Sequence, residues 1–307
     1  MKKEIFTGAG VALITPFTED GINYPEFARL IEDQIAGGTD AIVVAGTSGE
    51  AATMPDAEHR AAIKFACEKV HGRIPVIAGT GSNDTAYAID LSKYAESVGA
   101  TALLVVTPYY NKCTQAGLIA HYKAIADSVN IPIILYDVPS RTGVAIATET
   151  YAELAKHPNI VAVKEANGDL SKILRLRAAV PELTVYSGND DQIVPILALG
   201  GKGVISVLSN VAPKDTHDMC QFYFDGKVEE AAKLQIAYSD LIDALFCEVN
   251  PIPVKTAMRL KGYAAGPLRM PLSEMSEEHL EQLKTALKTL RKTSKKIAIV
   301  IIRRINE

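Results

Sequence analysis

Lys164 is the residue whose position most strongly suggests chemistry. It directly follows Val161-Ala-Val163, an apolar run of the kind that packs inside a protein core. Burying a lysine is costly because its ammonium group loses hydration. Two interpretations fit this position. Either the run ends here and the side chain reaches solvent along its aliphatic stem, or a desolvated amine serves as a nucleophile that forms a Schiff base with a carbonyl substrate.

Other apolar runs also end in residues that can do chemistry. Tyr136 is either an ordinary amphipathic aromatic residue or a phenol that carries protons for an imine-forming lysine. Thr47 and Ser48, within Gly46-Thr-Ser-Gly-Glu50, either make a turn with a helix cap or hold a carboxylate through hydroxyl and backbone N–H groups. Arg141 is either a solvated loop residue or a planar partner for a carboxylate.

Eight short apolar runs connect these residues to a fold. They are continuously hydrophobic rather than alternating, as expected for parallel strands that are buried on both faces. The runs are residues 11–15, 41–45, 75–79, 102–106, 132–136, 160–164, 183–186 and 203–206. Amphipathic stretches lie between them. Residues 25–35, 84–98 and 115–129 have helical spacing, with Asp84 and Thr114 as candidate N-caps.

The eight strand–helix units predict an α/β protein, a (β/α)8 TIM barrel over residues 1–225. The competing fold is an open doubly wound sheet, but the glycine fingerprint of dinucleotide-binding proteins is missing after the first strand. Residues 226–307 predict a C-terminal helical extension, with helices over 227–249, 254–262 and 276–291. The role of residues 292–307, which include an apolar run, stays open.

The barrel prediction explains how the polar residues can form one site. In a (β/α)8 barrel, the carboxyl ends of the strands and the loops after them make one face, where catalytic residues gather. Thr47, Tyr136, Arg141 and Lys164 all stand at or just after predicted strand ends. We therefore expect them to surround a common site, although they are far apart in the chain.

The composition limits the class of protein. The 307 residues are 48% hydrophobic and 22% charged, with a net charge of −4, which is typical of a soluble globular protein. A nucleic-acid partner is disfavoured because such proteins normally carry a basic surplus. No apolar run reaches the roughly 18 residues that span a bilayer, and no secretory signal precedes the fold, so we expect a cytoplasmic protein without a membrane partner. The cysteines and histidines form no close ligand pairs, so we expect no metal and no cofactor.

Five segments together resemble the dihydrodipicolinate synthase family. They are Gly46-Thr-Ser-Gly-Glu50, Thr107-Pro-Tyr-Tyr-Asn111, Tyr136-Asp-Val-Pro-Ser-Arg-Thr-Gly143, Val163-Lys-Glu165 and Asn250-Pro-Ile-Pro-Val-Lys255. The resemblance covers residues 1–290 and implies a lyase with 4-hydroxy-tetrahydrodipicolinate synthase activity. Such an enzyme condenses pyruvate with L-aspartate 4-semialdehyde through a lysine Schiff base, which opens the diaminopimelate and lysine biosynthetic branch.

The resemblance also implies catalytic roles. Lys164 forms the imine with pyruvate, and Tyr136, Thr47 and Tyr110 form a proton relay. Tyr110 enters the site from a partner subunit, so the minimal active unit is a dimer. The implied assembly is a homotetramer built as a dimer of dimers.

Further residues are implied to bind the substrates. Thr47 and Ser48 seat the pyruvate carboxylate, and Arg141 meets the carboxylate of the semialdehyde. Gly188 and Ile205 shape the pocket, Ile205 through its backbone carbonyl. Three positions depart from the commonest family pattern without loss of the chemistry: Ser48 stands where threonine is usual, Asp137 where asparagine is common and Asn189 where aspartate is common.

An effector site for lysine is less well matched. The residues that the resemblance assigns to it are Ala51, His59, Asn83, Tyr87 and Tyr109. Asp56 stands where some family members have histidine, and Tyr87 where lysine-sensitive members have an acidic residue. The effector's ammonium group loses a partner there, so we expect weak or absent feedback inhibition by lysine.

Three alternatives were weighed against this assignment. N-acetylneuraminate lyase and the 2-keto-3-deoxy sugar-acid aldolases share the fold and the imine chemistry, but Arg141 favours a substrate with a short-chain carboxylate. A catalytically inactive relative that acts as a binding protein is disfavoured because Lys164, Tyr136, Thr47 and Tyr110 are all retained. A dinucleotide-dependent oxidoreductase is disfavoured by the missing glycine fingerprint.

Overall fold

The eight predicted apolar runs correspond to the eight parallel strands that close into a barrel in the described part of the chain, in the order β1-β10-β9-β8-β7-β6-β5-β4. The structure is a computed structural model that describes residue 2 and residues 4–289. The barrel strands are β1 (Gly8–Ala12), β4 (Ala41–Val44), β5 (Val76–Gly79), β6 (Ala102–Val106), β7 (Ile133–Asp137), β8 (Ile160–Glu165), β9 (Thr184–Ser187) and β10 (Gly203–Ser206). The predicted (β/α)8 fold is confirmed.

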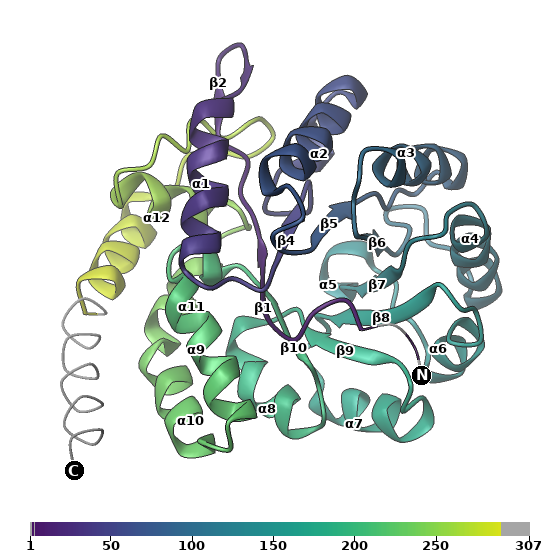
Figure 1. The fold of residues 1–307 in the computed structure, drawn as a ribbon. Helices are drawn as coiled ribbons and strands as arrows, with labels where there is room; N and C mark the ends of the chain where they lie inside the picture. The colour runs from purple at the N-terminus through teal and green to yellow at the C-terminus, as the bar shows by residue number, and fades with distance from the viewer. Residues whose placement is uncertain (1, 3, 290–307) are drawn as a thin grey trace.

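Helices surround the barrel as an outer ring (Figure 1). They are α1 (Tyr24–Ala36), α2 (Asp56–Val70), α3 (Thr85–Ser97), α4 (Gln115–Asp127), α6 (Thr148–Leu154), α7 (Leu170–Ala179), α8 (Ile193–Ala198) and α9 (Pro213–Phe224). Shorter elements are the antiparallel pair β2 (Phe17–Thr18) and β3 (Gly21–Ile22), the helix α5 (Pro139–Thr142), and the 3-10 turns η1 (Ala51–Thr53), η2 (Asp190–Gln192) and η3 (Leu208–Asn210). Asp84 and Thr114 cap α3 and α4 as predicted, because their side chains accept backbone N–H groups of the first turn.

The strands are buried on both faces, which explains their continuous hydrophobicity. Val43 and Ile77 belong to the layer inside the barrel, whereas Ile42 and Ala78 belong to the layer between the strands and the helices. Phe6 precedes β1 and stacks on a tyrosine ring of β9, with the ring centroids 4.2 Å apart. This stack fills the amino-terminal end of the barrel, so a site inside the barrel opens at the carboxyl end.

The first strand begins earlier than predicted. The hydrophobic pattern predicts residues 11–15, whereas β1 spans Gly8–Ala12. Gly8 pairs with Gly203 of β10 so closely that a Cβ on Gly203 would lie 1.9 Å from the Gly8 carbonyl oxygen. Glycine residues weaken the hydrophobic pattern by which a strand is recognised in a sequence. The strand start was therefore predicted too late, although the close pairing requires glycine there.

The chain after α9 forms a helical extension, with one difference from the prediction. The single helix expected over 227–249 is two helices, α10 (Val228–Ala237) and α11 (Ser239–Phe246), because the chain turns at the buried Tyr238. The last labelled helix, α12 (Ile252–Leu260), lies beside α1 (Figure 1), and residues 277–289 are also helical. The predicted division near residue 225 falls in the turn between α9 and α10. The apolar run in 292–307 lies outside the described residues.

Residue 2 and residues 4–289 contain neither a membrane-spanning helix nor a metal-binding cluster. None of the described helices is long and apolar enough to cross a membrane. No group of three or more histidine, cysteine, aspartate or glutamate side chains in the described part of the chain is arranged to hold a metal ion.

Candidate active site

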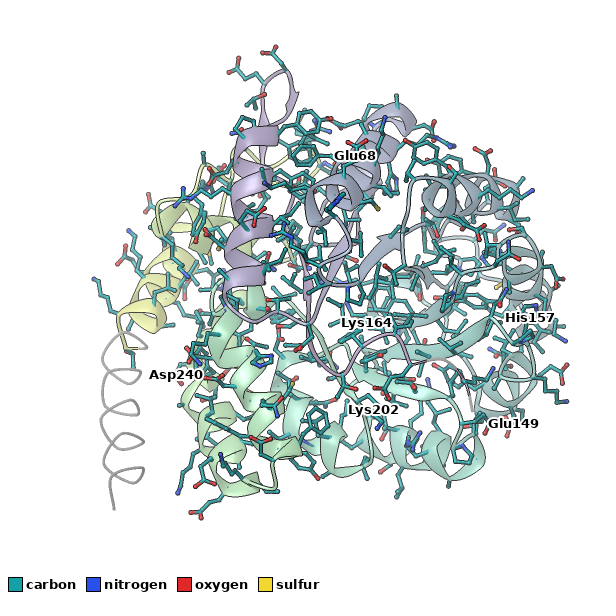
Figure 2. All side chains as sticks on the ribbon, viewed as in Figure 1. Glu68, Glu149, His157, Lys164, Lys202 and Asp240 are labelled. Atoms are coloured by element: carbon teal, nitrogen blue, oxygen red, sulfur yellow. The ribbon has the colours of Figure 1, made fainter. Side chains whose placement is uncertain are left out.

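Lys164 and Tyr136 meet at the carboxyl ends of β8 and β7. The two strands pair in parallel with Tyr136 opposite Lys164, and Lys164 Nζ lies 4.5 Å from the centroid of the Tyr136 ring. Both side chains are nearly buried, with 6% and 8% of their surface exposed. Figure 2 shows Lys164 well inside the ring of helices, whereas Glu149 and His157 lie at its outer edge. An amine held against a phenol inside a barrel is the arrangement that imine chemistry requires.

A cavity opens beside this pair at the carboxyl end of the barrel. It encloses about 630 Å³ of space that contains no protein atoms, and this figure includes solvent at its open mouth. Six of the predicted site residues line it, and they come from four different strand ends: Thr47, Ser48, Tyr136, Arg141, Lys164 and Gly188. The structure therefore brings together residues that are up to 141 positions apart, from Thr47 to Gly188.

The groups at the cavity wall suit an anionic ligand. Ser48 is buried, and Asn250 Nδ2 of the helical extension donates a hydrogen bond to its Oγ at 3.0 Å. Thr47 and Arg141 are exposed at the cavity, the latter on the short helix α5. A small carboxylate that enters the cavity meets hydroxyl and guanidinium groups before it reaches Lys164.

Two predicted site residues do not line the cavity of this chain. Ile205 is fully buried in β10, where it pairs with Gly10 of β1. Tyr110 is 92% exposed and has a φ of +70°, a conformation that is uncommon for a bulky residue. Its side chain stands in solvent rather than in the cavity of its own chain.

The residues assigned to an effector site lie outside the cavity, around the first turns of α2 and α3. His59 Nε2 lies 2.9 Å from the Gly79 carbonyl oxygen, and burial lowers the pKa of this histidine. Asn83 Nδ2 donates a hydrogen bond to the Tyr109 carbonyl oxygen at 3.4 Å. Ala51 begins the 3-10 turn η1 that precedes α2.

Asp56 and Tyr87, the two departures from the family pattern at the effector site, are hydrogen-bonded to each other. Arg60 Nε donates to an Asp56 carboxylate oxygen at 2.8 Å and also pairs with Asp90. Burial and a hydrogen bond to Asp56 raise the pKa of Tyr87 to about 12. The carboxylate of Asp56 is therefore already occupied by a guanidinium and a phenol.

Asp190 is a buried carboxyl group at this end of the barrel, and no role was predicted for it from the sequence. Its Oδ2 accepts the backbone N–H groups of Val207 and Leu208 at 3.0 and 2.9 Å, which holds the turn from β10 into η3. Burial raises its pKa. The residue follows a predicted strand end, but nothing in its neighbours predicts which backbone groups it binds.

A buried ion pair between Glu50 and Lys255 connects the loop after β4 to the helical extension. Glu50 has a left-handed φ of +56°, and its Oε1 lies 2.7 Å from Lys255 Nζ, with both side chains fully buried. Lys255 Nζ also donates to the Pro267 carbonyl oxygen at 2.8 Å. The backbone N–H of Arg269 donates to the second oxygen of Glu50 at 3.1 Å. The carboxyl end of the loop that carries Thr47 and Ser48 is therefore fixed by contacts with the helical extension.

The roles of Glu50, Lys255 and Asn250 were missed in the sequence, although both of their segments contributed to the resemblance. Desolvation lowers the pKa of Lys255, and the neighbouring Glu50 opposes this effect. The two partners are 205 residues apart, so no local charge pattern connects them. The one available local signal was Lys255 at the end of the mostly apolar segment Asn250-Pro-Ile-Pro-Val-Lys255.

Comparison with known proteins decides the family. The model of the dihydrodipicolinate synthetase family matches residues 5–290. The chain belongs to this family. The 4-hydroxy-tetrahydrodipicolinate synthase of Acetivibrio thermocellus is 57% identical over 289 residues, which cover 94% of this chain and 98% of that protein.

Solved structures of similar proteins share the fold over nearly the whole chain. The 4-hydroxy-tetrahydrodipicolinate synthase of Methylacidiphilum fumariolicum has a TM-score of 0.94 and 40% identity, and the match covers 95% of this chain and 98% of that one. The enzyme of Cyanidioschyzon merolae, crystallised with lysine bound, has a TM-score of 0.90 and 40% identity, with coverage of 94% and 99%.

The Lys255–Glu50 pair yields a stability prediction. Lys255→Met leaves the Glu50 carboxylate buried without its partner, so we expect a loss of about 3–5 kcal/mol of unfolding free energy. The double variant Glu50→Gln/Lys255→Met removes both charges and recovers most of that loss. Chemical denaturation of the three proteins measures the difference.

The matched control for this prediction is Lys214→Met, which breaks a solvent-exposed pair with Asp218. We expect it to cost less than about 1 kcal/mol. A Lys255→Met protein as stable as the Lys214→Met protein contradicts the buried-pair interpretation.

Proposed function

We propose that this enzyme condenses pyruvate with L-aspartate 4-semialdehyde to 4-hydroxy-tetrahydrodipicolinate by way of an imine on Lys164. One observation carries the proposal: the Lys164 amine lies against the Tyr136 ring in a cavity lined by hydroxyl and guanidinium groups. Relatives named 4-hydroxy-tetrahydrodipicolinate synthase, at up to 57% identity over nearly the full chain, support these substrates. The reaction makes the protein a lyase of diaminopimelate and lysine biosynthesis.

In the first proposed step, Lys164 Nζ attacks the keto carbon of pyruvate, and the carbonyl oxygen leaves as water. The departing oxygen must gain protons, and the attacking amine must lose them. Tyr136 is placed to move these protons because its ring contacts Lys164 Nζ. Loss of a proton from the pyruvate methyl group then converts the imine into an enamine, which is a carbon nucleophile.

In the second proposed step, the enamine carbon attacks the aldehyde carbon of the semialdehyde. The amino group of that substrate then attacks the imine carbon, closes the ring and releases the Lys164 amine. Ser48 and Thr47 bind the pyruvate carboxylate, and Arg141 binds the carboxylate of the semialdehyde. Gly188 lines the cavity where the turn after β9 packs closely against the end of β8, since a Cβ there would lie 2.7 Å from the Ala166 Cβ.

The proposed proton relay needs a second copy of the chain. Tyr110 is exposed and held in a left-handed backbone conformation, which suits a side chain that completes a partner's site. The active unit is then at least a dimer, and we propose a homotetramer built as a dimer of dimers. The carbonyl of Ile205 as a pocket element and a cytoplasmic location are parts of the same proposal.

The first prediction from this function is a covalent adduct. Incubation with pyruvate and borohydride reduces the imine, so we expect the mass of one reduced pyruvate adduct on the peptide that carries Lys164. Lys164→Ala abolishes the adduct, whereas the exposed control Lys202→Ala retains it. Mass spectrometry of the intact and digested protein makes the measurement, and an unmodified Lys164 peptide refutes the Schiff base.

The second prediction concerns the second substrate. Arg141→Ala removes a charged hydrogen bond worth about 1.5–3 kcal/mol, so kcat/KM for the semialdehyde falls by roughly 10- to 100-fold. The borohydride adduct with pyruvate is retained, because Arg141 does not hold pyruvate. Steady-state assays compare aspartate semialdehyde with N-acetylmannosamine. Faster turnover of N-acetylmannosamine by the parent enzyme instead supports the N-acetylneuraminate lyase alternative.

The third prediction concerns regulation. Asp56 is paired with Arg60, and Tyr87 replaces an acidic residue, so the ammonium group of free lysine finds no carboxylate partner. We expect weak or absent inhibition of the purified enzyme by lysine. A titration of initial rates with L-lysine tests this, and inhibition at sub-millimolar lysine contradicts it.

A further inference from the structure

Two buried carboxyl groups lie directly behind the imine-forming pair. Asp137 follows Tyr136 on β7 and Glu165 follows Lys164 on β8, and the register places Asp137 opposite Glu165. Neighbouring residues of a strand point to opposite faces. Tyr136 and Lys164 therefore face the barrel interior, while the two carboxyl groups face the surrounding helices. Both carboxyl groups are fully buried.

A single hydroxyl group bridges the two carboxyl groups. Tyr151 Oη of α6 lies 3.1 Å from Asp137 Oδ2 and 2.9 Å from Glu165 Oε1. A phenol has one proton to donate, so it can donate to only one of these oxygens. The other short contact is favourable only when that carboxyl group is itself protonated and donates to the phenol oxygen. Two ionised carboxylates and a phenol hold a single proton between them. The two short contacts require a second proton, carried by one of the carboxyl groups.

The charges lead to the same conclusion. Lys172 of α7 is the cation of the cluster: its Nζ pairs with Asp137 and lies 3.5 Å from Glu165 Oε1. Two ionised carboxylates with one ammonium leave a net charge of −1 in a buried place, whereas one added proton makes the cluster neutral. Burial of an uncompensated charge is costly, so the neutral cluster is favoured.

We propose that Asp137 and Glu165 hold one extra proton in the resting enzyme, and that its release sets the charge behind Tyr136 and Lys164. The two carboxyl groups are then positioning residues for imine formation, since they act through their strand neighbours. Glu165 carries the proton and donates it to Tyr151 Oη, and Tyr151 donates its own proton to Asp137. Release of the proton to solvent leaves the cluster with its net negative charge.

The surroundings of Glu165 support this assignment. Burial and the nearby Asp137 raise the pKa of Glu165 to about 7, and burial raises the pKa of Tyr151 well above its usual range. The phenol therefore stays protonated while the glutamate titrates near neutrality. The other groups that face the cluster are Tyr122 of α4, Lys172 of α7 and the amide of Asn167, which donates to Glu165.

The proposed consequence concerns the amine of Lys164 and rests on the function proposed above. Imine formation uses the neutral amine as the nucleophile, and a negative charge behind the two strands changes the electrostatic field at the reacting nitrogen. The extra proton keeps the Asp137–Glu165 cluster neutral while the amine attacks. Loss of this proton above neutral pH leaves a negative charge behind the reacting pair, and we expect imine formation to slow.

The direct test is infrared difference spectroscopy of the full-length enzyme between about pH 6 and about pH 8. We expect a protonated carboxyl band that disappears on the alkaline side. The band is absent in Glu165→Gln, and it falls by at least half in Asp137→Asn, where Glu165 ionises against Lys172 at lower pH. It persists in the matched control Glu149→Gln, a change of the same type on the exposed face of α6 (Figure 2). Asp190 is unchanged in all variants, so its signal cancels between them.

The functional test is the pH profile of the rate at which pyruvate is trapped by borohydride. We expect the profiles of the parent enzyme and of Glu149→Gln to have an inflection near pH 7. In Asp137→Asn we expect the inflection at a pH lower by about one unit or more. A merely structural role for Asp137 lowers the rate at every pH without moving the inflection, and that outcome overturns the proposal. A missing band in the parent enzyme, or a band that survives in both variants, overturns it as well.

Thermal stability supplies a readout that does not depend on catalysis. A carboxyl group whose pKa is raised from 4.5 to about 7 on folding stabilises the fold below about pH 4.5, and this contribution is lost as the pH rises through 7. The melting temperature of the parent enzyme therefore falls relative to that of Asp137→Asn between about pH 5 and about pH 8. A constant difference between the two proteins contradicts the extra proton. Failure of the adduct on Lys164 refutes the proposed function alone, because the infrared band and the melting curves do not require pyruvate.

Discussion

The parallel pairing of β7 with β8 is the constraint on which the rest of the site depends. Its register sets Tyr136 against Lys164, and the alternation of side chains then sets Asp137 against Glu165 on the other face. One pair of strands therefore builds the proposed imine-forming centre inside the barrel and the proposed proton-binding cluster outside it. The helices α6 and α7 contribute the groups that contact this cluster from outside the barrel, Tyr151 and Lys172.

The helical extension completes the other side of the cavity. Asn250 contacts Ser48, and Lys255 holds Glu50 at the far end of the same loop. A loop between strand and helix is free to move unless its polar groups are bound, and here both ends of the loop after β4 are bound to a segment more than 200 residues away. The extension thus positions the loop that carries Thr47 and Ser48, and it also contacts α1, where the Ala264 N–H donates to Glu26 Oε1 at 2.8 Å.

The parts of the site that could be predicted were those with a local signal. Lys164 and Tyr136 ended apolar runs, and Thr47 and Ser48 lay in a glycine-flanked loop, so each stood out against its neighbours. The partners of Asp137, Asp190 and Glu50 carried no such signal. Their hydrogen bonds go to residues of other elements, and a single sequence contains no record of which elements will touch.

By itself, the sequence predicted the fold class, the eight strands and the limits of several helices, and it singled out Lys164 as the lysine proposed to form the imine. These features follow from hydrophobic periodicity, capping side chains and the cost of burying an amine, all of which act over a few residues. Only the tertiary structure decided where β1 begins, that Lys255 neutralises Glu50, and that Tyr151 joins Asp137 to Glu165. These features depend on close approach between distant segments, and barrel closure fixes those distances only after every strand has found its neighbour.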